Sequence, residues 1–135
     1  MSFVVWNQIP GDYLEFGVWQ GRSFSIAYHE LNQQRRDHVS LGHSDSRYEA
    51  WASNRPRFFA FDSFEGIPDI EGAETMVDYA PGSYAASESE FRQLLSRQGV
   101  SFDDVVVVKG WYEDTCTSET KQQHGLDRVA VALID

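Results

Sequence analysis

The sequence predicts an α/β fold with a parallel sheet, because apolar strand candidates alternate with helix candidates along the chain. Four runs have the composition of strands, at about 12–16, 57–62, 105–109 and 128–135. The four consecutive valines that begin the third run are typical of a strand buried on both faces. Strands that alternate with helices indicate βαβ units and a parallel sheet.

Three helices are expected between these strands. Ser23 opens a segment with apolar residues at helical spacing, namely Phe24, Ala27, Tyr28 and Leu31. Ser87 and Glu90 have the spacing of a capping box, which predicts a helix that ends near Gly99. A shorter helix is expected at 117–124. These segments complete the alternation of strands and helices.

Two segments lack such a pattern. Residues 37–57 are polar and irregular, apart from one helical turn around 48–52, and we expect a solvated connection there. Residues 69–84 are acidic and contain Pro81-Gly82, which predicts a surface loop.

Composition restricts the class of protein. A chain of 135 residues is expected to form one domain. Its 11 basic and 21 acidic residues give a net charge of −10, which disfavours nucleic acid as a partner because phosphate contacts need a basic surface. No apolar run approaches the roughly 18 residues of a membrane span, so we expect no membrane partner.

The cysteine and histidine content restricts the possible disulfides and metal sites. Cys116 is the only cysteine, so it forms neither an intrachain disulfide nor a thiolate zinc site. A reducing, cytoplasmic location is therefore expected. The four histidines show no metal-ligand spacing with one another, and we interpret them as structural or exposed.

Polar residues and glycines follow all four strand candidates, where ligands bind in open α/β sheets. After the first strand the sequence reads Glu15-x-Gly17-x-x-x-Gly21. Glycines let a ligand approach the backbone, and the following helix offers free N–H groups. Glu15 suits a ligand ammonium group. The alternative is a tight turn with Glu15 as a surface charge.

The other strand ends carry further candidates. Asp62 is placed to accept the hydroxyls of a ribose, although a capping or turn role is the alternative. Trp111 or Tyr112 is a candidate to pack near an adenine ring, unless both serve core packing. Asp135 is a candidate metal ligand or general base, but one carboxylate is insufficient for a magnesium site.

Four blocks in this order resemble the macrocin O-methyltransferase (TylF-type) family of class I methyltransferases. They are Gly11-Asp-Tyr-Leu-Glu-Phe-Gly-Val-Trp-Gln-Gly21, Phe61-Asp-Ser-Phe-Glu-Gly-Ile-Pro68, Val108-Lys-Gly-Trp-Tyr-Glu-Asp-Thr115 and Val131-Ala-Leu-Ile-Asp135. The block around Asp-Ser-Phe-Glu-Gly is the most distinctive. The resemblance implies a Rossmann-like parallel sheet with flanking helices, truncated after about the fourth strand of the class I methyltransferase fold.

The resemblance also implies S-adenosylmethionine and Mg²⁺ as cofactors and a sugar or other small-molecule hydroxyl as the acceptor. Asp135 matches the first aspartate of a block that serves magnesium binding and catalysis. The residues that we expect to bind the cofactor are Glu15, Gly17, Val18, Trp19, Gly21, Ser23, Asp62, Ser63, Phe64, Gly110 and Trp111.

Two other interpretations are kept. A fragment of a nicotinamide-dependent oxidoreductase shares the strand–loop–helix start, but Asp62 lies 41 residues after Gly21, against roughly 20 in the dinucleotide fingerprint. A non-catalytic α/β module that self-associates is the third interpretation, because the apolar strand at 129–134 offers an open edge. That edge also leads us to expect a fragment of a longer protein, and self-association is compatible with the methyltransferase interpretation.

Overall fold

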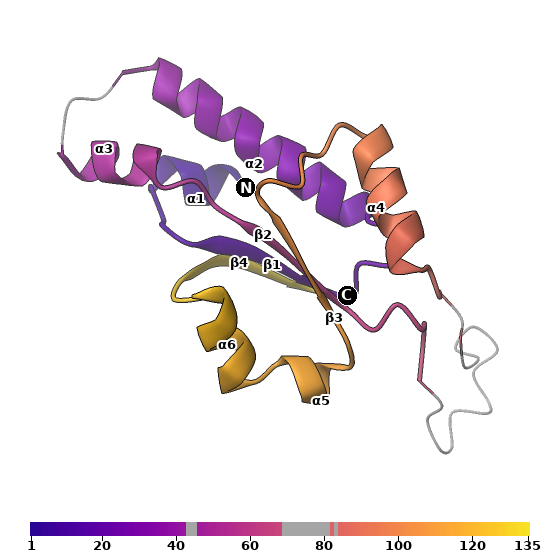
Figure 1. The fold of residues 1–135 in the computed structure, drawn as a ribbon. Helices are drawn as coiled ribbons and strands as arrows, with labels where there is room; N and C mark the ends of the chain where they lie inside the picture. The colour runs from indigo at the N-terminus through magenta and orange to yellow at the C-terminus, as the bar shows by residue number, and fades with distance from the viewer. Residues whose placement is uncertain (43–45, 69–81, 83) are drawn as a thin grey trace.

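One parallel sheet of four strands forms the centre of the structure, a computed structural model that describes residues 1–42, 46–68, 82 and 84–135. The strands are β1 (Asp12–Phe16), β2 (Phe58–Asp62), β3 (Val105–Lys109) and β4 (Val129–Ile134). They are hydrogen-bonded in the order β3-β2-β1-β4, and all pairs are parallel (Figure 1). The predicted parallel α/β fold is confirmed.

Helices cover both faces of the sheet (Figure 1). One face carries α1 (Ser2–Trp6), α2 (Arg22–Ser40), α3 (Ser46–Ser53) and α4 (Glu88–Arg97), and the other carries α5 (Tyr112–Thr115) and α6 (Ser118–His124). The predicted capping box begins α4: the Ser87 Oγ accepts from the Glu90 N–H at 3.2 Å, and the Glu90 carboxylate accepts from the Ser87 N–H at 2.8 Å.

The alternation of side chains along the strands divides the core into two clusters. Tyr13, Phe58 and Ala60 face α2 and α4, where they join buried residues of those helices such as Phe24, Leu31, Phe91 and Leu95. The opposite face holds a smaller cluster of Leu14, Phe59, Phe61 and Val108. The larger cluster lies under α2, which follows the glycine loop and is thereby fixed against β1.

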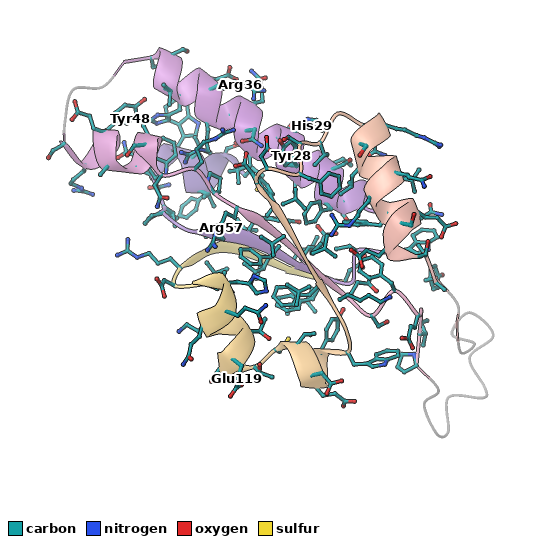
Figure 2. The ribbon with its side chains drawn as sticks, viewed as in Figure 1. Tyr28, His29, Arg36, Tyr48, Arg57 and Glu119 are labelled. Atoms are coloured by element: carbon teal, nitrogen blue, oxygen red, sulfur yellow. The ribbon has the colours of Figure 1, made fainter. Side chains whose placement is uncertain are left out.

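Arg57 fixes α6 at the amino end of the sheet (Figure 2). Its guanidinium lies 2.6 Å from the Asp12 carboxylate and donates to the main-chain oxygens of His124 and Gly125 at 2.5 and 3.0 Å. The planar guanidinium suits this arrangement because it offers several donors at once. This ion pair therefore lies at the opposite end of the sheet from the carboxyl ends of the strands.

The prediction of a solvated connection at 37–57 was wrong for much of the described part, whereas the helical turn expected around 48–52 lies within α3. Helix α2 continues to Ser40, and α3 buries Tyr48 and Trp51 to 5% exposure. These rings lie three residues apart on one helix face and pack against His38. The Arg35 guanidinium lies 4.2 Å above the Trp51 ring, which makes a cation–π contact. The spacing of Tyr48 and Trp51, rather than the polar composition of the segment, therefore determined that it forms a helix packed against α2.

Some expectations concern residues outside the described ranges. The predicted surface loop at 69–84 falls there except for Gly82 and Tyr84, and so does His43. Of the described helices, none has both the length and the apolar character to cross a membrane. Cys116 is exposed as a free thiol.

Candidate functional site

The carboxyl ends of β1, β2 and β4 bring three predicted site segments together. Phe16 is in register with Phe61 on one side and with Ile134 on the other. The Gly17 N–H donates to the Phe61 carbonyl at 2.9 Å, and the Asp135 N–H donates to the Phe16 carbonyl at 3.0 Å. The glycine loop therefore lies between the segments that begin at Asp62 and Asp135.

Asp62 organises the glycine loop. One carboxylate oxygen accepts from the backbone N–H groups of Val18 at 2.7 Å and Trp19 at 3.0 Å. The other accepts from the Phe64 N–H at 2.7 Å. The turn role that we kept as an alternative is present. A ribose contact stays a prediction, because a carboxylate has about four acceptor sites and three are used here.

Glycine is required at positions 17 and 21 for different physical reasons. Both have positive φ, of 84° and 77°. A Cβ at Gly21 would lie 2.7 Å from the Phe91 ring, so this glycine allows α4 to pack on the loop. A Cβ at Gly17 would lie 3.3 Å from the Asp135 main-chain oxygen and 3.4 Å from the Tyr112 hydroxyl. Gly17 therefore keeps the backbone open at the edge of the candidate site.

Glu15 is fully buried, so it is not a surface charge. One carboxylate oxygen accepts from the Ser23 hydroxyl at 2.6 Å, and the other accepts from the Tyr13 hydroxyl. Burial raises the pKa of Glu15, the two hydroxyl donors lower it, and the charge of Asp135 raises it further. Burial also raises the pKa of Tyr13. This network links β1 to the first turn of α2 beneath the loop.

Of the two aromatic candidates after β3, Trp111 and Tyr112, it is Tyr112 that lies beside the glycine loop, although only Trp111 was among the residues expected to bind the cofactor. The Tyr112 hydroxyl reaches Gly17, and its ring contacts Phe16 edge-on at 5.8 Å. Burial raises the pKa of Tyr112, and the charges of Asp62, Cys116 and Asp135 raise it further. The position of Tyr112 at the start of α5 turns it toward β1, a direction that the sequence alone does not give.

Gly110 and Trp111, which were predicted to bind the cofactor, have structural roles after β3. The Trp111 carbonyl accepts from the Asp114 and Thr115 N–H groups at 3.0 Å and so begins α5. A Cβ at Gly110 would lie 2.8 Å from the Thr115 methyl, so this glycine permits the close turn. Cofactor contacts of Gly110 and Trp111 stay predictions.

Aromatic side chains lie along the turn after β2 and the neighbouring glycine loop. The Ser63 hydroxyl accepts from the Glu65 N–H at 3.2 Å, which tightens the turn. Phe64 is buried and packs on Phe91 with ring centroids 5.6 Å apart. Trp19 is 43% exposed, and its ring meets that of Tyr84 edge-on at 5.4 Å. We did not predict Tyr84, because it lies in a segment without a regular sequence pattern.

A metal site is not complete in the described part of the chain. No group of three or more histidine, cysteine, aspartate or glutamate side chains is arranged there to hold a metal ion. Asp135 is a single carboxylate at this edge, and magnesium prefers near-octahedral oxygen ligation. Mg²⁺ therefore does not fit the described residues by themselves.

The strand order and the site segments define a Rossmann-like α/β domain of the methyltransferase type. The chain belongs to the macrocin-O-methyltransferase (TylF) family, whose sequence profile matches residues 1–135. Two solved structures share the fold. The O-methyltransferase NovP superposes with a TM-score of 0.65 at 24% identity, over 98% of this chain and 48% of that chain. The calicheamicin methyltransferase CalS11 gives 0.66 at 20% identity, over 99% and 51%.

Two curated relatives are O-methyltransferases from Streptomyces. The 8-demethyl-8-(2,3-dimethoxy-alpha-L-rhamnosyl)-tetracenomycin-C 4'-O-methyltransferase of Streptomyces olivaceus is 30% identical over 83% of this chain and 39% of its own length. The demethyldecarbamoylnovobiocin O-methyltransferase of Streptomyces niveus is 27% identical over 98% of this chain and 44% of its own length. The chain thus spans less than half the length of these relatives.

Proposed function

We propose that this protein is an S-adenosylmethionine-dependent O-methyltransferase and that the described residues form its cofactor-binding half. The observation that carries the proposal is the meeting of Gly17, Asp62 and Asp135 at one edge of the sheet in a member of the TylF family. This edge is where ligands bind in open α/β folds.

The residues present fit a cofactor with positive charge. Gly17 keeps the backbone free of a side chain between Asp135 and Tyr112. Three carboxylates, those of Glu15, Asp62 and Asp135, lie around the loop and favour an ammonium or sulfonium group over an anion. When bound, S-adenosylmethionine supplies an electrophilic methyl group on its sulfonium sulfur.

The remaining cofactor contacts extend from the loop and the turn after β2. We propose that Val18, Trp19, Gly21 and Ser23 surround the amino-acid part, while Asp62, Ser63, Phe64, Gly110 and Trp111 surround the nucleoside part. Asp62 uses its remaining acceptor capacity toward a ribose hydroxyl while it holds the loop.

A hydroxyl group of a small molecule is the proposed methyl acceptor. Support comes from the two relatives, whose names describe O-methylation of natural products, one of them on a rhamnosyl group. Asp135 is the proposed general base, which accepts the hydroxyl proton so that the oxygen attacks the methyl carbon. No step of this proposal depends on a metal ion.

Calorimetric titration with S-adenosylhomocysteine tests the proposal. We expect saturable binding with one site per chain, and a weaker affinity for Gly17→Val because the added side chain meets Asp135 and Tyr112. Gly99→Val is the matched control, since Gly99 has a similar φ of 78° and no heavy atom within 4 Å of a Cβ.

A second titration, with NAD⁺, separates the methyltransferase from the nicotinamide alternative. The proposal requires no thermal stabilisation by NAD⁺ under conditions in which S-adenosylhomocysteine stabilises the protein. The reverse result, stabilisation by NAD⁺ and none by S-adenosylhomocysteine up to its solubility limit, contradicts the proposal and favours the oxidoreductase.

A further inference from the structure

Glu15 is a buried carboxylate without a basic partner in the described part of the chain. It is 0% exposed, and the ion pairs of the described residues, which involve Arg55, Arg57 and Arg92, do not include it. A buried charge is costly unless hydrogen bonds and an opposite charge compensate for it. The described residues supply the hydrogen bonds, and the opposite charge is left for a ligand to supply.

Tyr13 supplies one of these hydrogen bonds from the same strand. Side chains two residues apart on β1 share a face of the sheet, so Tyr13 lies beside Glu15. Its hydroxyl donates to one carboxylate oxygen of Glu15, and the Ser23 hydroxyl donates to the other at 2.6 Å. Both carboxylate oxygens are therefore held, one from β1 and one from the first turn of α2.

The ring of Tyr13 fixes the position of its hydroxyl. Tyr13 is 2% exposed, and its ring contacts those of Phe24 and Phe58, with centroid distances of 5.9 and 5.6 Å. A phenylalanine ring would make the same contacts, so the packing of the core does not require the hydroxyl. The hydroxyl donates to Glu15, and its contribution is therefore to the state of that carboxylate.

Hydroxyl donors favour the charged form of a carboxylate. Burial raises the pKa of Glu15, and the hydroxyls of Ser23 and Tyr13 oppose this effect by lowering it. The anion lies in surroundings of low dielectric constant, where a charge acts over a longer distance than in water. It also keeps acceptor capacity, because a carboxylate has about four acceptor sites and two are used here.

We propose that Tyr13 is a positioning residue that holds the Glu15 carboxylate as the counter-charge of the ammonium group of the cofactor. This inference rests on the proposed function and adds a residue that acts without touching the cofactor. Tyr13 is almost fully buried, so its hydroxyl influences the site through Glu15. Loss of the hydroxyl should therefore weaken binding of the amino-acid part of the cofactor and spare the nucleoside part.

Tyr28 offers a matched control from the same core cluster. It lies on α2 and is 8% exposed (Figure 2). Its hydroxyl accepts a hydrogen bond from the Ser101 N–H at 3.3 Å, away from the glycine loop. Tyr28→Phe therefore removes a buried hydroxyl that is bonded elsewhere than to Glu15.

Calorimetric titrations with two ligands separate the two parts of the cofactor. S-adenosylhomocysteine carries the ammonium group, whereas 5′-methylthioadenosine has the same nucleoside and sulfur without the amino-acid part. Each ligand is titrated into the unmodified protein, Tyr13→Phe and Tyr28→Phe. Glu15→Gln and the double variant Tyr13→Phe/Glu15→Gln complete a cycle, because a residue that acts through another loses its effect when the other is replaced.

We expect Tyr13→Phe to lower the affinity for S-adenosylhomocysteine about tenfold, because a hydrogen bond to a charged group is lost. The affinity for 5′-methylthioadenosine should stay within about twofold. Tyr28→Phe should leave both affinities unchanged. In the Glu15→Gln background, the additional Tyr13→Phe change should have no further effect on either ligand.

Four results overturn the inference. An unchanged affinity of Tyr13→Phe for S-adenosylhomocysteine removes the proposed role. Equal losses for both ligands, the same loss in the Glu15→Gln background, or failure of Tyr13→Phe to fold assigns the hydroxyl to the stability of the fold instead. Failure of the proposed function is distinct from these, because in that case the unmodified protein does not bind S-adenosylhomocysteine.

Discussion

The Asp62 carboxylate accepts a hydrogen bond from the backbone N–H of Val18 at 2.7 Å, which joins the end of β2 to the loop that follows β1. Residues 44 positions apart in the sequence are thereby locked together at the carboxyl edge of the sheet. A second bond, from the Trp19 N–H, makes the same carboxylate a fixed support for the loop. Any ligand held by this loop depends on Asp62 even without touching it.

Asp62→Asn tests this support. The amide has one acceptor oxygen in place of two, so at least one backbone N–H loses its partner. We expect the free energy of unfolding to fall by about 1–3 kcal/mol and the calorimetric affinity for S-adenosylhomocysteine to fall with it. Asp114→Asn changes an exposed carboxylate on α5 and serves as the control. Unchanged stability and affinity in Asp62→Asn would contradict the supporting role.

Gly21→Ala is expected to destabilise the fold strongly. The new Cβ would lie 2.7 Å from a Phe91 ring carbon and 3.0 Å from a Leu95 methyl, at a φ of 77°. Overpacking and backbone strain together predict a loss of about 2–4 kcal/mol in urea unfolding. Gly99→Ala shares the positive φ without the contacts and is expected to lose only about 1 kcal/mol. Equal losses in both variants would show that packing of α4 on the loop does not matter.

Glu15→Gln is expected to change how stability depends on pH. Burial holds the pKa of Glu15 above its ordinary value of 4.5, so the folded chain keeps this proton at pH values where the unfolded chain has released it. The stability contribution is therefore full below pH 4.5 and is lost as the pH rises through the folded pKa. Glutamine carries no such proton, because its amide does not titrate.

Urea unfolding at several pH values measures this effect. The stability of Glu15→Gln relative to the unmodified protein should increase as the pH rises above 4.5 and through the folded pKa of Glu15. Glu113→Gln replaces an exposed carboxylate on α5 in the same way and is the control. A constant difference for Glu15→Gln would mean that Glu15 titrates normally in the folded state.

The 135-residue chain is expected to self-associate through β4. This strand pairs with β1 on one side, and Val129, Leu133 and Ile134 are exposed. An apolar strand edge invites pairing with another chain, and a charge on it opposes pairing. In sedimentation velocity we expect an average mass that rises with concentration and falls back toward the monomer in Val129→Lys.

Val39→Lys is the matched control for self-association, because Val39 on α2 is 45% exposed and Val129 is 47% exposed. Val39→Lys should leave the mass unchanged. A monomer at every concentration in the unmodified chain, or equal effects of both lysines, would rule out the β4 edge as the contact.

The strands were predictable because their signal is local. The consecutive valines of the third strand, the three phenylalanines of the second and the glycines after the strands are recognised from neighbouring residues, and the sheet edge then follows from parallel topology. Only one turn of α3, around 48–52, was predicted, because its polar composition concealed two aromatic residues, Tyr48 and Trp51, whose burial depends on His38 and Arg35 of another helix. The position of Tyr84 at the candidate site was not predicted for a similar reason, because its partner Trp19 is distant in the sequence.

The sequence by itself determined the parallel α/β fold, the four strands, the three helices α2, α4 and α6 between them, and the residues that stand at the strand ends. The tertiary structure decided what those residues do. It buried Glu15 between Tyr13 and Ser23, turned Asp62 toward the loop and brought Tyr112 to Gly17. Composition and spacing act over a few residues, whereas the partner of a buried carboxylate is chosen by atoms that only folding brings within hydrogen-bond distance.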